Sequence, residues 1–125
     1  MLHNQGQAAA VVKLLDPVSA AATANATSGW VDVRAAEGDL VFTAQVGAMT
    51  GSITWTIEDA TDGVGAGAAG VTPNEGAFAA GAANQIQKRT INASAVRGWI
   101  RIIGTIVTGP SLVAANIKYH PKYTV

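Results

Sequence analysis

Residues that could carry out chemistry are few and scattered in this sequence. It contains no cysteine, which excludes both a disulfide framework and a thiolate metal site. The two histidines, His3 and His120, lie near opposite ends, and no H-x-x-x-H, G-x-S-x-G or P-loop pattern is present. No nucleophile and base can be paired. The sequence therefore predicts no catalytic residues, no cofactor and no enzyme.

One acidic segment deserves separate consideration as a metal site. In EDATDG, Glu58, Asp59 and Asp62 could gather oxygen ligands for calcium at the end of a strand. The same residue types are ordinary turn formers, and we favour a turn. The following Gly63–Gly67 segment is rich in glycine, but neither a helix nor a lysine follows it. It predicts a loop and no phosphate-binding site.

Charge limits the classes of partner. Eight basic and eight acidic residues give zero net charge, which argues against a protein that binds nucleic acid by neutralising phosphates. All the acids lie between Asp16 and Glu75, and six of the eight bases lie between Lys88 and Lys122. This separation either makes two surfaces complementary across a sheet or subunit boundary, or arises by chance on solvated faces.

Composition points to a protein with a partly covered surface. Only 13% of residues are charged, against about 25% in an average soluble domain. We therefore expect another subunit to cover part of the surface, although alanine contributes much of the apolar content. No apolar run approaches about 18 residues and no signal-peptide pattern is present, so neither a membrane span nor signal-dependent secretion is expected.

The stretch Arg97–Tyr119 has the strongest secondary-structure signal. Ile100, Ile102 and Ile106 alternate with outward residues, and a second alternating run follows the turn at residues 108–110. The pattern predicts two antiparallel strands paired in a hairpin at the centre of a sheet.

Other strands are expected at residues 29–34, 40–47, 53–58 and 85–92, the first three as a meander with short turns, one of them at residues 37–39. Residues 8–15 form a strand or short helix that Asp16-Pro17 ends, residues 20–28 form a linker, and Pro121 argues against a central strand at the C-terminal end. No helix-length apolar stripe is present. We predict an all-β protein, an antiparallel two-sheet β-sandwich, jelly-roll-like, with seven or eight strands.

Two segments stand apart from the strands. Residues 1–7 are predicted to be a flexible arm in front of a single domain at residues 8–125. Residues 60–83 form a Gly/Ala-rich loop, anchored by Val71, Thr72 and Phe78, that either contacts another subunit or is simply mobile.

Large aromatic and basic side chains are the candidate interface residues. Trp55, flanked by isoleucines, is the first choice for the core, whereas Trp30 and Trp99 alternate out of register with their apolar neighbours. Outward arginines are predicted to be solvated or paired with acids. The candidate interface set is Trp30, Phe78, Arg89, Arg97, Trp99 and Arg101.

The order of GWVDV, EGDLVFTAQVG, SITWTIEDATDG, a Gly/Ala-rich middle and RGWIRIIGTIVTGPS resembles small β-rich head proteins of tailed bacteriophages and prophages. The resemblance implies a capsid decoration, or cement, protein. Such a protein assembles in the bacterial cytoplasm as a homotrimer, binds the major capsid protein and remains on the virion surface. Residues 1–7 and 60–83 would then face the capsid or a neighbouring copy, and the bases from Lys88 to Arg101 could meet acids of that copy.

Two other functions remain open. A tail or head-tail connector protein would form rings of six or twelve copies. A carbohydrate-binding sandwich would stack sugars on Trp30 or Trp99.

Overall fold

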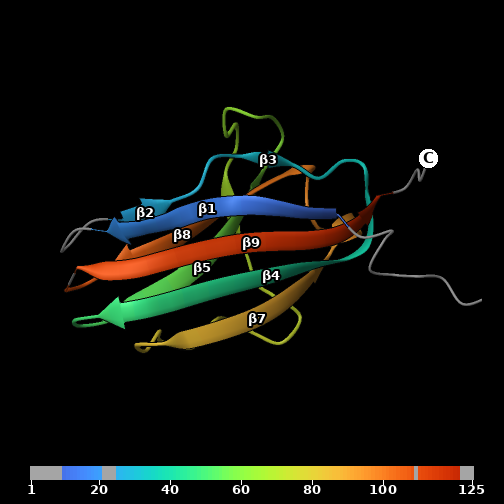
Figure 1. Ribbon diagram of the computed structural model, residues 1–125. Helices are drawn as coiled ribbons and strands as arrows, with labels where there is room; N and C mark the ends of the chain where they lie inside the picture. Colours follow the sequence, from blue (N-terminus) through green and yellow to red (C-terminus); the bar gives the residue numbers. More distant parts are fainter. Residues whose placement is uncertain (1–9, 21–24, 109, 122–125) are drawn as a thin grey trace, which may run out of the picture.

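Two antiparallel sheets pack face to face in the computed structural model, which describes residues 10–20, 25–108 and 110–121 (Figure 1). The first sheet has the order β1 (Ala10–Ala20), β9 (Ser111–Pro121), β4 (Ala36–Met49) and β7 (Gln85–Asn92). The second has the order β2 (Asn25–Thr27), β8 (Trp99–Ile106), β5 (Ile53–Ala60) and β6 (Ala69–Val71), and β3 (Val31–Asp32) also pairs with β8. The predicted all-β sandwich is confirmed, and the described residues form nine strands, three of them very short.

The core lies between the sheets. Leu40, Phe42 and Ile117 of the first sheet face Trp55 and Ile102 of the second, and each is at most 1% exposed. The prediction that Trp55 is a core residue is confirmed. Within the described segments the only helical element is the single 3₁₀ turn η1 (Ala93–Ala95), and no helix there is long and apolar enough to cross a membrane.

The predicted central hairpin is wrong. Its two strands exist, but β8 lies in the second sheet and β9 in the first. The chain crosses between the sheets at the same end as the β4–β5 connection, where the Val107 N–H donates to the Ser52 carbonyl and the Thr50 N–H to the Pro110 carbonyl, at 3.1 and 3.3 Å. Each strand therefore buries its apolar side by facing the opposite sheet, and each occupies the interior of its own sheet.

The predicted meander is also wrong. β4 belongs to the first sheet, while β3 and β5 lie on either side of β8 in the second. Residues 37–39 form no turn between strands: they lie within β4, where a register shift against β9 occurs and Gly38 has φ +74°. Glycine adopts this conformation without the strain that a Cβ would cause, so the strand continues through the irregularity.

Asp16-Pro17 does not end the first strand as predicted, whereas Pro121 is the last residue of β9 and pairs with β4 alone. β1 continues through Asp16-Pro17 to Ala20, with register shifts between Lys13 and Val18. β1 is an edge strand, where a missing N–H is tolerated beside such irregularities. β9 reaches Pro121, beyond the last residue paired with β1, and residues 25–27 of the predicted linker form β2.

Part of the Gly/Ala-rich segment is held in place by contacts with the neighbouring strands. β6 pairs with β5, and Phe78 is 7% exposed, so Val71 and Phe78 hold the segment as predicted, whereas Thr72 is exposed. β7 matches the prediction for residues 85–92. Its Ile91 points inward and Ile86 outward, and no register shift occurs against β4, so the two isoleucines lie on opposite faces of a regular strand. The predicted arm at residues 1–7 lies outside the described residues.

Candidate binding faces

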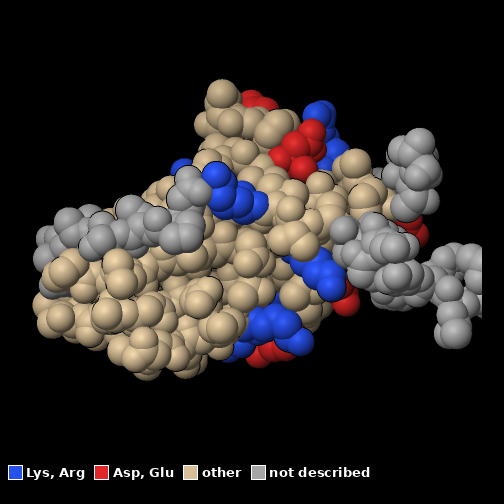
Figure 2. All heavy atoms as spheres, viewed as in Figure 1, with Lys and Arg blue, Asp and Glu red and all other residues tan. Residues whose placement is uncertain are grey.

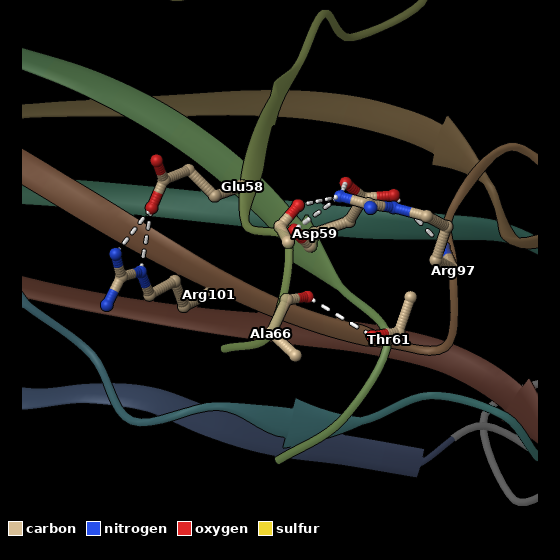
Figure 3. Close-up of polar contacts among 7 residues, drawn as sticks. Glu58, Asp59, Thr61, Ala66, Arg97 and Arg101 are labelled. Carbon is tan, nitrogen blue, oxygen red and sulfur yellow. Dashed lines mark hydrogen bonds and ion pairs between the residues drawn. The ribbon is translucent and has the colours of Figure 1, made fainter. Parts of the chain in front are cut away.

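The outer face of the second sheet holds four of the six candidate interface residues. Glu58 and Arg101 stand directly opposite each other on β5 and β8. Arg101 Nη2 lies 2.6 Å from Glu58 Oε1, and Arg101 Nε donates to the same oxygen at 2.8 Å (Figure 3). The guanidinium carbon of Arg101 also lies 4.5 Å from the centre of the Trp30 ring. Arg101 is therefore paired with an acid and an aromatic ring of its own chain.

Arg97 closes a second ion pair at the end of β5 (Figure 3). Its Nη2 donates to Asp59 Oδ1 at 2.7 Å and its backbone N–H to Oδ2 at 3.0 Å. The Asp59 side chain is only 7% exposed, and the hydrogen bond from Arg97 lowers the pKa of this carboxyl below its ordinary value. The same Nη2 donates to the Gly67 carbonyl at 2.7 Å. Arg97 thereby ties the loop after β5 to the sheet.

This loop lies on the two outward tryptophans. A Cβ built on Gly63 would lie 3.0 Å from the Trp99 ring, and one on Gly65 would lie 2.8 Å from Trp30 Nε1. The Arg34 guanidinium carbon lies 5.3 Å from the Trp99 ring centre, and Arg34 Nη2 is 2.7 Å from Asp32 Oδ2. Each ring is thus contacted by an arginine and a glycine of its own chain.

The EDATDG acids point in three different directions. Glu58 lies on the outer face, Asp59 is buried, and Asp62 Oδ1 accepts the N–H groups of Val64 and Ala66 at 3.0 and 2.9 Å. These backbone donors lower the pKa of the Asp62 carboxyl. The geometry agrees with the turn that we favoured, and no group of three potential metal-ligating side chains occurs within the described segments.

Of the other two candidates, Arg89 belongs to β7 and Phe78 lies in the loop between β6 and β7. The Arg89 guanidinium carbon is 5.3 Å from the Phe78 ring centre, and Arg89 Nε donates to the Ala77 carbonyl at 3.4 Å. Because Phe78 is buried, its side chain already packs within the described chain and anchors the loop between β6 and β7.

The loop between β6 and β7 also covers part of the free edge of β7. The Thr90 N–H donates to Glu75 Oε1 at 2.8 Å, and the Thr90 carbonyl accepts the Asn74 N–H at 2.8 Å. The Gln87 amide makes 3.0 Å hydrogen bonds to both the N–H and the carbonyl of Ala79. The segment therefore satisfies polar groups at an edge that could otherwise pair with another chain.

The outer face of the first sheet is different, and we call it the lysine face. Its members are the outward residues of four strands. They are Val11, Lys13, Asp39, Val41, Thr43, Gln45, Ile86, Lys88, Thr90, Asn92, Leu112, Ala114, Asn116 and Lys118. Figure 2 shows that its area near the C-terminal end of β4 carries no charged side chain, while basic side chains gather toward the middle.

Three large apolar side chains are exposed on the lysine face. Val11 is 67% exposed, Ile86 64% and Leu112 48%, on β1, β7 and β9 respectively. A shallow groove of about 410 Å³ runs between β1, β9 and β4, with Val11, Thr43 and Ala114 among its lining residues. Unlike the second sheet, this face has no described loop across it.

Strand register places the lysines in adjacent rows. Lys13 pairs with Asn116, Asn116 with Thr43, and Thr43 with Lys88, which makes one row across four strands. In the next row Lys118 lies between Val11 and Val41. Neither row contains an aspartate or a glutamate. The next outward residue of β4 after Val41 is the exposed Asp39, which pairs with Asn92. The face therefore combines an uncharged area with two basic rows and an acidic residue at their border.

The sequence analysis did not predict this face, although two apolar residues indicated it. Leu112 and Ile86 occupy the outward positions of alternating strands, where a large apolar residue is unexpected unless something covers it. The interface candidates were instead chosen for their aromatic and basic side chains, and these side chains pack within the chain. Of the histidines, His120 lies opposite Glu37 at the end of β9, and His3 is outside the described residues.

No protein-family model matches the chain, and no curated protein is significantly similar to it in sequence.

Proposed function

We propose that this protein is a virion structural protein, a capsid decoration protein that binds the outside of a phage head through its lysine face and stabilises the shell. The observation that supports this most is the contrast between the two outer faces. On the second sheet, the loop at residues 61–68 packs on Trp30 and Trp99, and the ion pairs of Arg97 and Arg101 are made within the chain. The first sheet, by contrast, exposes Val11, Ile86 and Leu112. Exposed apolar side chains gathered on one face are typical of an interaction surface.

Such a protein needs a rigid scaffold and a contact surface, and many modest contacts become strong when a symmetric oligomer binds a symmetric lattice. We propose a homotrimer bound to the major capsid protein on the virion surface. A tail or head-tail connector protein would use the same scaffold in a ring of six or twelve.

Carbohydrate binding is the second candidate. Trp30 and Trp99 remain partly exposed, but each ring already contacts an arginine and a glycine. Stacking a sugar would require a ring face that the loop at residues 61–68 leaves free. Quenching of tryptophan fluorescence by glycans would favour this function.

The test combines solution mass with capsid binding. Light scattering gives the oligomeric state, and the protein is then sedimented with expanded empty heads, prepared without decoration protein, from the phage or prophage that encodes it. We expect a trimer that co-sediments to a saturating stoichiometry. A monomer that stays in the supernatant at all head concentrations would contradict the proposal.

A further inference from the structure

We infer that a cavity beside β5 and β6 binds a primary carboxamide, the group that ends an asparagine or glutamine side chain. The cavity measures about 290 Å³ and lies between these two strands and the loop that joins β6 to β7. Its lining residues include Trp55, Ile57, Val71, Pro73 and Phe78. The site belongs to the second sheet, away from the lysine face, and it does not depend on binding to phage heads.

The backbone of Trp55 has one N–H and one C=O without a partner at this edge of the sheet. Successive residues of a strand point their backbone groups to alternate sides. The Ser52 carbonyl accepts the N–H of Val107, at the end of β8, whereas the Ile53 carbonyl accepts the Gly81 N–H on the opposite side at 2.7 Å. Two residues after Ile53, the N–H and C=O of Trp55 therefore also point away from β8. No residue that the structure describes forms a hydrogen bond with them there.

Pro73 explains why β6 stops short of Trp55. In the register of β5 and β6, Ile57 lies opposite Val71, and two further residues along each strand would bring Pro73 opposite Trp55. Proline has no N–H to donate to the Trp55 carbonyl, so the pairing ends before this point. The chain turns instead toward the first sheet, where the Asn74 N–H donates to a carbonyl of β7 at 2.8 Å.

The indole N–H of Trp55 is a third polar group at this place. Its Nε1 is buried and has no hydrogen-bond partner among the described residues. A Cβ built on Gly104 of β8 would lie 3.0 Å from Trp55 Cζ3 and 3.3 Å from Cε3, so this edge of the ring faces β8. Nε1 is on the opposite edge of the planar ring and therefore faces the β6 side, where the cavity lies. Because Trp55 is only 1% exposed, leaving these groups unpaired costs free energy that a bonded ligand would recover.

A carboxamide is complementary to these three groups. Its oxygen has two lone pairs, which can accept the backbone and indole N–H groups of Trp55, and its NH₂ group can donate to the Trp55 carbonyl. The chain uses part of this arrangement elsewhere, since the Gln87 amide bonds both the N–H and the carbonyl of Ala79 at 3.0 Å. A carboxylate has no N–H to donate and an ammonium group has no acceptor, so neither satisfies all three groups.

The experiment titrates the ¹⁵N-labelled protein with propionamide, which carries the end group of a glutamine side chain, and follows the N–H signals by NMR. We expect saturable shifts of the Trp55 backbone and indole signals, with a millimolar dissociation constant because so small a ligand makes few contacts. The indole signals of Trp30 and Trp99 should not move. Propionate and N,N-dimethylpropionamide, which lack the N–H donor, should bind at least about fivefold more weakly.

A second pair of probes distinguishes a protein side chain from a free small amide. It consists of a tripeptide with a central glutamine, acetylated and closed as the N-methylamide, and the same peptide with glutamate. If the glutamine peptide binds at least as tightly as propionamide and the glutamate peptide does not, the natural ligand is a side chain of another protein. If propionamide alone binds, the ligand is a free amide.

A variant tests the contribution of the indole. Trp55→Phe removes the indole N–H and leaves the backbone pair, so propionamide should bind about fivefold more weakly. Trp30→Phe is the matched control and should bind as wild type, because Trp30 lies on the outer face of the sheet. Urea unfolding checks that each variant is folded; if Trp55→Phe is not, the probes on the wild type decide alone.

Two results would overturn the inference. If propionamide leaves both Trp55 signals unchanged up to about 100 mM, beyond the range expected for a ligand of this size, the cavity binds no carboxamide. If propionamide and propionate shift the Trp55 signals equally, the cavity admits small molecules without recognising the amide.

Discussion

Asp59 is the one charged residue of the described chain that is buried, so the ion pair with Arg97 has the clearest energetic consequence. Asp59→Asn keeps the shape of the side chain but removes the charge, and we expect a loss of about 1–2 kcal/mol in the free energy of unfolding. Arg97→Met should cost more than this, because a buried carboxylate then loses its charged partner, whereas an unpaired Arg97 can still reach water.

Urea unfolding of both variants at pH 7 tests this order. The double variant, Asp59→Asn with Arg97→Met, serves as the control, since it should recover part of the loss caused by Arg97→Met. A larger loss for Asp59→Asn than for Arg97→Met would contradict the assignment of Asp59 as the buried partner.

The same carboxyl predicts how stability depends on pH. Its pKa in the folded protein lies below the value of about 3.9 expected in the unfolded chain. The stabilisation is therefore present above about pH 4 and is lost as pH falls through the folded pKa. The lowered pKa values of Asp32, Asp62 and Glu75 act in the same direction.

We expect the urea midpoint of the wild type to fall as pH is lowered from about 5 to 2, and that of Asp59→Asn to fall less steeply. Parallel curves for the two proteins would show that Asp59 contributes nothing to acid sensitivity. Measurement at fixed ionic strength separates this effect from salt screening.

Among the connecting elements, the loop at residues 61–68 depends on glycine where it meets the second sheet. Gly65 has φ +89°, and a Cβ there would lie 2.8 Å from Trp30 Nε1. Gly65→Ala should therefore destabilise the protein by about 1–3 kcal/mol through strain and displacement of the ring. Gly70→Ala is the matched control, because nothing lies within 4 Å of its Cβ position and its φ is ordinary.

Urea unfolding and tryptophan emission measure both effects. Gly65→Ala should shift the emission, since the environment of Trp30 changes, and Gly70→Ala should leave the free energy of unfolding within about 0.5 kcal/mol of wild type. Equal stabilities for the two variants would show that the loop does not pack on Trp30.

The strands show what a sequence pattern can and cannot predict. Alternation in residues 53–58 and 99–106 correctly indicated strands and their buried sides, because side-chain direction repeats every two residues. It carried no information on which strand pairs with which, so β8 and β9 were predicted to pair although they lie in opposite sheets. Pairing depends on how connections cross the ends of the sandwich, which involves residues distant in sequence.

The candidate interface residues raise a different question, which is what else contacts them. Trp30, Trp99, Arg97 and Arg101 were correctly placed outside the core, and the alternative that arginines pair with acids is confirmed for Arg97 and Arg101. Their partners, however, come from the glycine-rich loop and from β5 of the same chain. An outward position does not imply a free surface when a long loop can fold back over it.

The two outer faces therefore differ: a loop of the same chain packs on part of the second sheet, whereas no segment within residues 10–20, 25–108 and 110–121 lies across the first sheet. This asymmetry predicts that exposed apolar residues differ in function by location. Ile86→Thr with Leu112→Ser changes two exposed side chains on the lysine face, while Val64→Ser with Val107→Ser changes two of comparable or greater exposure away from it. Neither pair packs in the core, so both variants should unfold within about 1 kcal/mol of wild type.

Binding to expanded empty heads should separate the two variants. We expect Ile86→Thr with Leu112→Ser to need about tenfold more protein for half-saturation, because the variant removes apolar area that a partner would otherwise cover. The Val64 and Val107 variant should bind as wild type. If the two lost affinity equally, exposed apolar area in general would drive binding; if only the Val64 and Val107 variant lost it, the contact surface would lie on the loops and the lysine face would be a solvated sheet.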